Sequence, residues 1–293
     1  MSSNRELRQR ISSIKNISQV TKALETVSAS KVKTATKAAL NTKPYSEKAW
    51  KVLLHLARQP GHKTIHPLLT IRENVNNVLV ILITSDRGLN GAHNSNMIKY
   101  MHEYFKKTNK PCSFITVGRK GRDFLIRRNK NIVADFSELS DHLEFSHVSS
   151  IGRIVIEEYL TNKSDEVYLA FTDFVSMMVQ VPTIRKLLPL SVEYSEDSEN
   201  KNNITHPINA CFIYEPEQKE LLDQIIPRFT SVQIYQSILS AQASDHAARM
   251  IAMRNATDNA GELISKLQLI YNKARQQSIT NDILDIVGGS SAL

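Results

Sequence analysis

Apolar residues in the first part of the chain recur every three or four positions, which is the spacing of one helix face. They form a single narrow stripe that consists of Leu7, Ile11, Ile14, Ile17, Val20, Leu24 and Val27. A stripe this narrow is typical of a coiled-coil seam rather than of a helix lying on a globular core. The helical pattern continues past Pro44, where we expect a kink or a break, and it stops near Pro60.

The far end of the chain repeats this pattern over about residues 221–287, where Gly261 is the only glycine and Pro227 the only proline. At about 1.5 Å per residue such a helix would be roughly 100 Å long, so it must project from any compact domain. We expect Met250 and Met253 to lie in its packed core. Two narrow-striped helices at opposite ends of one chain predict a long antiparallel coiled coil.

The middle of the chain has a different sequence pattern, in which apolar runs typical of strands alternate with helical patterns. The predicted strands are 78–84, 113–117, 132–136, 167–172 and 177–181, and the predicted helices are 94–107, 120–129 and 145–160. This alternation predicts a Rossmann-like α/β domain with a mainly parallel sheet. The chain thus divides into an N-terminal coiled-coil helix (1–60), a central α/β domain (70–210) and a C-terminal coiled-coil helix (211–293) that pairs with the first.

Basic residues gather in the N-terminal helix. Residues 1–51 hold eleven Lys and Arg against three acids, so their net charge of +8 equals that of the whole 293-residue chain. Such an element attracts an acidic protein, a membrane surface or nucleic acid. Only Tyr45 and Trp50 could stack on bases there, so an acidic protein is at least as good a candidate. A basic nucleic-acid-binding coiled-coil protein stays as the alternative.

Two cysteines, Cys112 and Cys211, give neither a disulfide framework nor the spacing of a metal site. So few cysteines favour a reducing, cytoplasmic compartment. The N-terminus lacks the apolar core of a signal peptide, and no apolar run is long enough to span a bilayer.

The loop after the first predicted strand, residues 84–96, reads TSDRGLNGAHNSN. An apolar strand, a glycine-bearing loop and a helix are how many phosphate sites begin, but neither GxGxxG nor GxxxxGK[ST] is present. A tight turn capped by Asn94 or Ser95 is the favoured interpretation, and a nucleotide-binding α/β enzyme is the competing one. Arg87 stands at the carboxyl edge of the sheet, so it is a candidate for an exposed ionic contact. No catalytic set of residues can be singled out along the chain.

Four stretches resemble the gamma subunit of F-type ATP synthases, in the right order over nearly the full chain. Residues 247–293, AARMIAMRNATDNAGELISKLQLIYNKARQQSITNDILDIVGGSSAL, are similar to its C-terminus. Residues 8–35, RQRISSIKNISQVTKALETVSASKVKTA, are similar to its first helix. The loop at 84–96 and the segment 180–190, QVPTIRKLLPL, resemble its internal signatures.

The resemblance implies a rotor. In that family the coiled coil penetrates a ring of three alpha and three beta subunits, and the α/β domain forms a foot with the epsilon subunit on the membrane c ring. Ion flow turns the ring and the shaft, and the asymmetric shaft drives the beta subunits through the conformations that make ATP. The catalytic residues lie in beta, so the resemblance implies a non-catalytic subunit without a cofactor or metal, one copy per complex.

The resemblance also implies contact residues. Those that would meet the beta subunits are Lys22, Leu24, Arg87, Arg275, Gln276 and Thr280, and those of the foot are Tyr214 and Glu215. The family's usual cysteine in the loop is Asn90 here, and its usual methionine in the first helix is Leu24. The redox-regulatory insertion of chloroplast members is missing. With no transit peptide apparent, the resemblance implies a bacterial protein, peripheral on the cytoplasmic face of the plasma membrane.

Overall fold

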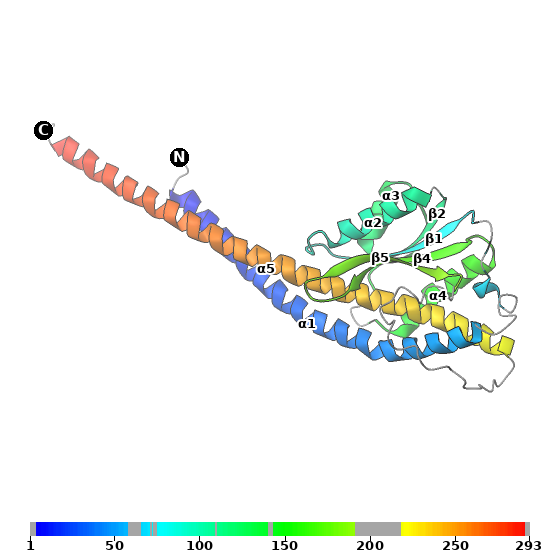
Figure 1. Ribbon diagram of the computed structural model, residues 1–293. Helices are drawn as coiled ribbons and strands as arrows, with labels where there is room; N and C mark the ends of the chain where they lie inside the picture. Colours follow the sequence, from blue (N-terminus) through cyan, green and yellow to red (C-terminus); the bar gives the residue numbers. More distant parts are fainter. Residues whose placement is uncertain are drawn as a thin grey trace.

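Two long helices form a rod, and the middle of the chain is attached to one end of it (Figure 1). The computed structural model describes residues 4–57, 66–70, 72, 75–108, 110–139, 143–190 and 218–290. Helix α1 spans Asn4–Ala57 and helix α5 spans Gln218–Ser290. They run side by side in opposite directions, with Thr21 Oγ1 2.7 Å from Thr257 Oγ1. The predicted antiparallel coiled coil is confirmed.

Helix α5 is longer than its partner. Its 73 residues span roughly 110 Å at 1.5 Å per residue. Beyond the Thr21–Thr257 contact, α1 has 17 residues left to Asn4, whereas α5 has 33 left to Ser290. The end of α5 therefore projects alone, and the helix continues through the two glycines at 288 and 289, beyond the predicted end at about residue 287. No helix in the described part of the chain is long and apolar enough to cross a membrane.

The seam of the coiled coil departs from the predicted stripe. The positions of α1 that are at least half-buried and step by four and three are Leu7, Ile11, Ile14, Ser18, Thr21, Glu25, Ser28 and Val32. From Ser18 to Ser28 this seam is polar and made largely of small hydroxyl residues. Small side chains let two helices approach closely, and a polar pair such as Thr21 with Thr257 favours one register.

The displaced apolar residues form a second line, the outer strip, made of Ile17, Val20, Leu24 and Val27. Their spacing of three and four puts them on one face of α1. Three of them are exposed, Ile17 by 56%, Val20 by 59% and Val27 by 51%, and Leu24 is half-buried. The prediction that they line the seam is wrong, because the shorter hydroxyl residues occupy it.

Pro44 lies inside α1, and the helix continues through it. The predicted break does not occur, although a proline removes one backbone hydrogen bond. Ala39 and Ala49, on either side of Pro44, both pack against the main core of the α/β domain. This packing holds the helix on both sides of the weakened turn.

The sheet has the order β3-β2-β1-β4-β5. Its strands are β1 (Val78–Ile83), β2 (Cys112–Val117), β3 (Asn131–Phe136), β4 (Glu166–Phe174) and β5 (Gln180–Leu188). The first four are parallel, and β5 pairs antiparallel with β4. The crossovers pass through α2 (His93–Thr108), α3 (Arg119–Arg127) and α4 (Phe145–Leu160), and a 3₁₀ turn, η2, spans Pro67–Leu69. The predicted α/β domain with a mainly parallel sheet is confirmed.

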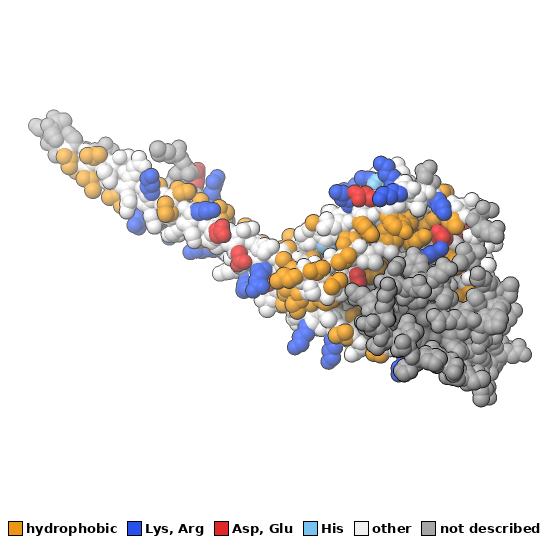
Figure 2. Space-filling model, viewed as in Figure 1, with side chains coloured by type: hydrophobic (Ala, Val, Ile, Leu, Met, Phe, Trp, Pro, Cys, Tyr) orange, Lys and Arg blue, Asp and Glu red, His pale blue; other side chains and the backbone are white. Residues whose placement is uncertain are grey.

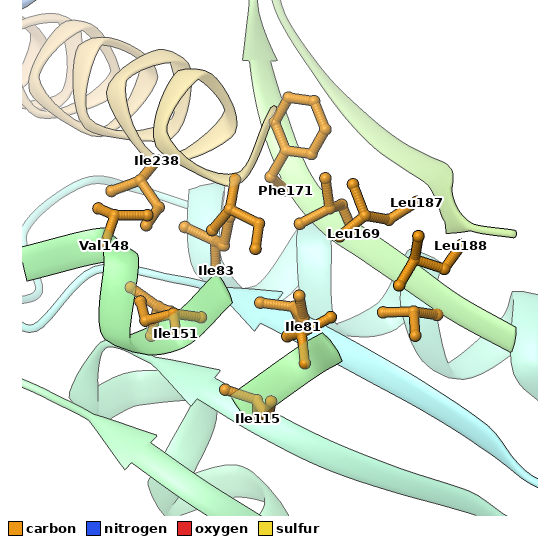
Figure 3. Packing of buried hydrophobic residues seen from close by; sticks show 14 of the residues in the cluster. Ile81, Ile83, Ile115, Val148, Ile151, Leu169, Phe171, Leu187, Leu188 and Ile238 are labelled. Carbon is orange, nitrogen blue, oxygen red and sulfur yellow. The ribbon is translucent and has the colours of Figure 1, made fainter. Parts of the chain in front are cut away.

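Strand β1 separates two apolar layers, because successive side chains of a strand point to opposite faces. Val78, Val80 and Leu82 face α2 and α3 and pack with Met97 and Leu125. Leu79, Ile81 and Ile83 face the other side and pack against α4 and α5. Figure 3 shows Ile81 and Ile83 pointing toward Val148 and Ile151 of α4 and Ile238 of α5. The N-terminal part of α5 thus covers one side of the domain core and also forms half of the rod.

The fifth predicted strand, 177–181, is wrong in its bounds. Residues 177–179 belong to the turn between β4 and β5, where the N–H of Ser176 donates to the carbonyl of Val179 over 3.0 Å. The strand itself begins at Gln180 and contains Pro182. An edge strand tolerates a proline, because one side of its backbone has no neighbouring strand to bond.

Candidate functional site

The loop between β1 and α2 lies at the carboxyl edge of the sheet. Strand β1 has β2 on one side and β4 on the other, so the chain reverses its winding direction here. Open α/β sheets usually bind ligands at such a switch point. Within the loop Ser85 and Asn90 are buried, whereas Arg87 and Leu89 are exposed.

The N-terminus of α3 meets this loop, and its backbone amides are already bonded. The N–H of Arg119 donates to Asp86 Oδ1 over 2.9 Å, and that of Lys120 donates to the carbonyl of Ser85 over 3.1 Å. The N–H of Gly121 donates to Thr84 Oγ1 over 2.8 Å. A phosphate bound at a helix N-terminus needs such amides. The chain's own carboxylate, carbonyl and hydroxyl groups occupy them, which argues against a nucleotide at this edge.

Close packing makes this capping possible. Gly118, just before α3, has a φ of +99°, and a Cβ there would lie 2.1 Å from the carbonyl oxygen of Thr84. Only glycine allows this approach and this backbone conformation. Asp86 also accepts a hydrogen bond from the N–H of Glu138 over 3.1 Å, which ties the ends of three strands together.

On its other side the loop is bonded to α5. Asn90 Nδ2 donates to Asp245 Oδ1 over 2.7 Å. Arg249, one turn further along α5, pairs with Asp245 Oδ2 at 2.8 Å and donates from Nε to the carbonyl of Gly88 over 3.3 Å. The side chains of Asp245 and Arg249 are 13% and 12% exposed, so this is a nearly buried ion pair. We call Asn90, Asp245 and Arg249 the loop joint.

His93 begins α2 next to the loop joint. Burial lowers the pKa of His93, the charge of Asp245 opposes this change, and the charge of Arg249 adds to it. Its folded pKa therefore lies below the usual 6.5, so the imidazole is neutral at pH 7.

An open cavity of about 580 Å³ lies between this loop, the start of α3 and α5. Its charged lining residues are Lys31, Asp86, Arg87, Arg119, Glu138, Asp245 and Arg249. Arg119 is paired with Glu138, and Arg249 is paired with Asp245. The guanidinium of Arg87 makes no hydrogen bond or ion pair within the described residues, so it is available to a partner.

Two of the other predicted contact residues lie at a neighbouring level of the rod. Lys22 is exposed and pairs with Glu25 at 3.0 Å on the same helix. Leu24 is half-buried in the outer strip. Thr21 meets Thr257, and Thr257 is eight residues along α5 from Arg249, or roughly 12 Å. The fold therefore brings Lys22 and Leu24 near the level of the loop joint, although 60 or more residues separate them from Arg87 in the sequence.

The remaining residues are not part of that group. Arg275, Gln276 and Thr280 are exposed on the far part of α5, and Thr280 Oγ1 donates to the carbonyl of Gln276 over 2.9 Å. Arg275 is 26 residues beyond Arg249, or roughly 40 Å. Tyr214 and Glu215 lie outside the described residues. The predicted contact residues thus lie at two heights along the rod, one near the loop joint and one far along α5. The predicted contacts at Tyr214 and Glu215 stay predictions.

Sequence reasoning missed the loop joint. Asp245 and Arg249 are four residues apart on a helix, the spacing of a helical ion pair, so half of the joint could have been found. Asn94, predicted as a possible helix cap, instead accepts a hydrogen bond from the N–H of Ser85 over 3.1 Å. No local pattern connects Asn90 with a residue 155 positions away.

The fold defines a class of protein: a projecting antiparallel two-helix rod that carries an α/β domain, whose α3 amides at the ligand edge are capped by the chain itself. The sequence profile of the ATP synthase family matches residues 3–293. ATP synthase gamma chains of Roseiflexus sp. (strain RS-1) and Dehalococcoides mccartyi (strain CBDB1) are each 40% identical over 100% of this chain, covering 99% and 100% of their own lengths. That of Herpetosiphon aurantiacus is 41% identical over 100% of this chain and 99% of its own length.

Solved structures share the fold. The rotor of the Euglena gracilis mitochondrial ATP synthase in rotational state 1 matches with a TM-score of 0.63 at 19% identity, over 94% of this chain and 98% of that one. A chain of the OSCP/F1/c-ring assembly of the same enzyme in rotational state 3 matches with a TM-score of 0.66 at 20% identity, over 99% and 94%. The chain belongs to the gamma-chain family of ATP synthases.

Proposed function

We propose that this chain is the central rotor shaft of an F-type ATP synthase, and that it transmits torque without catalysing a reaction itself. The coiled coil turns inside a ring of three alpha and three beta subunits, and the α/β domain stands with epsilon on the c ring. Family membership supports this role, and so does the shape of the molecule. Each angle of an asymmetric shaft favours a different conformation of beta by differential contact.

One observation carries the proposal: the end of α5 is a single helix that exposes aliphatic side chains. Ile279, Ile283, Leu284, Ile286 and Val287 are between 50% and 72% exposed. Figure 2 shows hydrophobic side chains on the surface near this end of the rod. A single helix with such a surface has no neighbouring element that packs against it and stabilises it in water. It therefore needs other protein subunits around it.

The outer strip supports a second contact lower on the shaft. Ile17, Val20 and Val27 are apolar and exposed, and Lys22 lies on the same stretch of α1. An apolar strip with basic neighbours fits the acidic, partly apolar loops that a beta subunit would present.

At these two levels we propose that the beta subunits meet Lys22, Leu24, Arg87, Arg275, Gln276 and Thr280, and that Tyr214 and Glu215 contact the c ring or epsilon at the foot. The division into residues 1–60, 70–210 and 211–293 follows the same assignment of shaft and foot. Peripheral attachment to the cytoplasmic face of a bacterial plasma membrane belongs to this proposal.

Assembly tests the role. The tagged chain, expressed with matching alpha and beta subunits, should elute from a sizing column as a complex of three alpha, three beta and one copy of this chain, with ATPase activity that the chain alone lacks. A monomer that ignores alpha and beta would refute the proposal. Duplex binding that weakens steeply with salt would then favour the nucleic-acid alternative.

Arg87→Glu tests the lower contact. Arg87 has no partner of its own within the described residues, so its replacement should leave the melting temperature of the chain unchanged. Reversing the charge should weaken the coupling of ATP hydrolysis to ion pumping, because it removes an ionic contact with beta. Equal coupling in the variant and the wild type would reduce Arg87 to a solvated charge.

A further inference from the structure

We infer that Asn90 is a positioning residue: its amide fastens the loop of residues 84–91 to Asp245 on α5 and thereby holds Arg87 at a set angle about the shaft. The inference rests on the proposed function, in which Arg87 contacts a beta subunit. It adds that the direction of this contact follows the rotation of α5 itself, through one hydrogen-bonded joint.

Both hydrogens of the Asn90 amide are used in hydrogen bonds. Its Nδ2 carries two hydrogens and donates to Asp245 Oδ1 over 2.7 Å and to Ser85 Oγ over 3.0 Å. Its Oδ1 accepts from Asn94 Nδ2 over 3.4 Å. Asn90 is 4% exposed, and the Asp245 carboxylate is 13% exposed. A hydrogen bond to a carboxylate is stronger than one between neutral groups, and a nearly buried one is protected from competing water.

The amide orientation is determined by its partners. A flipped Asn90 would place its carbonyl oxygen against the carboxylate of Asp245, and two acceptors repel each other. The bond therefore has one polarity, with the loop as donor and α5 as acceptor.

The backbone around Asn90 shows that the loop is held. Leu89 has a φ of 64° and Gly91 a φ of 60°, so the left-handed region occurs on both sides of Asn90. Leucine adopts this conformation only where its surroundings enforce it. A Cβ on Gly91 would lie 4.0 Å from Cβ of Ala252, which puts this side of the loop directly on α5.

Arg87 sits within the same small network. Ser85 Oγ donates to the carbonyl of Arg87 over 2.8 Å, and Arg249 Nε donates to the carbonyl of Gly88 over 3.3 Å. The carbonyl groups of Arg87 and Gly88 are thus both bonded to side chains. One is Arg249 of the loop joint, and the other is Ser85, which is bonded to Asn90. The side chain of Arg87 projects from an anchored base, so its direction depends on the joint.

Hydrogen exchange in the full chain tests the joint directly. Asn90→Asp places two carboxylates against each other and should loosen the loop. The loop amides that carry hydrogen bonds are those of Ser85, which donates to Asn94 Oδ1 over 3.1 Å, and of His93, which donates to the carbonyl of Asn90 over 3.3 Å. These two amides should exchange roughly tenfold faster in the variant. The double variant Asn90→Asp with Asp245→Asn exchanges donor for acceptor and should return most of the protection. The control is Asn131→Ala, because Asn131 Nδ2 donates to Ser113 Oγ over 3.0 Å within the sheet, and it should leave the loop amides unchanged.

Two results would overturn the joint. One is wild-type protection of the loop amides in Asn90→Asp. The other is a double variant that exchanges no more slowly than Asn90→Asp alone. Circular dichroism of each variant checks that α1 and α5 stay helical, and Asn90→Ala, which adds no charge, serves if Asn90→Asp fails to fold.

Coupling in membranes that hold the assembled complex tests whether Asn90 acts through Arg87. Asn90→Ala and Arg87→Ala should lower the ratio of ion pumping, measured for both H⁺ and Na⁺, to ATP hydrolysis by similar factors, and the double variant should lower it no further. Factors that multiply would show that Asn90 acts independently of Arg87. A wild-type complex that fails to pump would refute the proposed function instead, while the exchange experiment on the full chain would still decide the joint.

Discussion

The core of the α/β domain and the seam of the coiled coil bury different residues. Ile81 and Leu79 of the domain are fully buried between sheet and helices, with branched apolar neighbours on every side. The seam of the rod holds Thr21 and Ser28, while apolar Val20 is 59% exposed beside them. The domain therefore buries its apolar surface between its own elements and the adjoining part of α5. Between Ile17 and Val27 the rod instead exposes apolar surface, which suits a part that other proteins surround.

Ile81→Ala should give the largest effect. Ile81 is 0% exposed in the layer between the sheet, α4 and α5, so its truncation leaves a cavity that the sheet cannot close. The expected loss in the free energy of unfolding is about 3–5 kcal/mol. Urea unfolding followed by circular dichroism measures it. A loss below about 1 kcal/mol would mean that the domain is packed as loosely as the rod.

Gly118→Ala should come second. The new Cβ would clash with the carbonyl of Thr84, and alanine disfavours the φ of +99°. We expect a loss of about 2 kcal/mol or more, together with movement of α3 away from the loop. Unfolding curves give the first quantity, and exchange of the Arg119 and Gly121 amides gives the second. Unchanged protection of those amides would contradict the capping of α3 by the loop.

Acid should weaken the α/β domain through Asp165. Burial opposes ionisation of this carboxylate, but hydrogen bonds from the N–H groups of Asn77 and Asn76 and from Arg72 outweigh it, so its pKa is lowered from 3.8. A carboxylate with a depressed folded pKa stabilises the protein above its unfolded pKa, and this contribution is lost as the pH falls through the folded pKa.

Asp165→Asn should remove this part of the acid dependence below about pH 4. Melting curves of the wild type and the variant between pH 7 and pH 3 measure it. Parallel curves over the whole range would show that Asp165 does not couple protonation to folding.

Val20→Ser should have the smallest effect on the chain itself. Val20 is 59% exposed, so its replacement should change the free energy of unfolding by no more than about 0.5 kcal/mol. It should nevertheless weaken assembly with alpha and beta, since the outer strip then loses apolar contact area. Val32→Ser, at a fully buried seam position, is the matched control that should destabilise the chain. If Val20→Ser destabilised the chain and Val32→Ser weakened only assembly, the outer strip would serve folding and the seam would serve contact with alpha and beta.

Much of the fold could be predicted, because local patterns report it. Helix α4 occupies the predicted residues 145–160, and α2 and α3 begin one residue before the predicted starts. The seam could not be predicted in full, because Ile17 and Val20 have the right spacing for it but belong to the neighbouring face. Which of two adjacent faces of α1 is buried depends on the partner helix. Here α5 packs against the face that carries Ser18, Thr21 and Ser28.

The candidate site divides in the same way. The exposure of Arg87 could be predicted. A charged residue just after a buried strand lies at the carboxyl edge of the sheet, whichever strands are its neighbours. The amides of α3 that close this edge, and the bond of Asn90 to Asp245, depend on chain segments 33 to 155 residues apart in the sequence.

The sequence by itself determined the two projecting helices, the parallel sheet and the basic N-terminal segment, because periodicity and charge are local properties of the chain. Only the tertiary structure decided that the α3 amides beside the loop are capped by the chain itself and that the loop is fastened to α5. Those outcomes depend on hydrogen bonds between distant segments, whose partners meet only after the sheet and α5 have packed together.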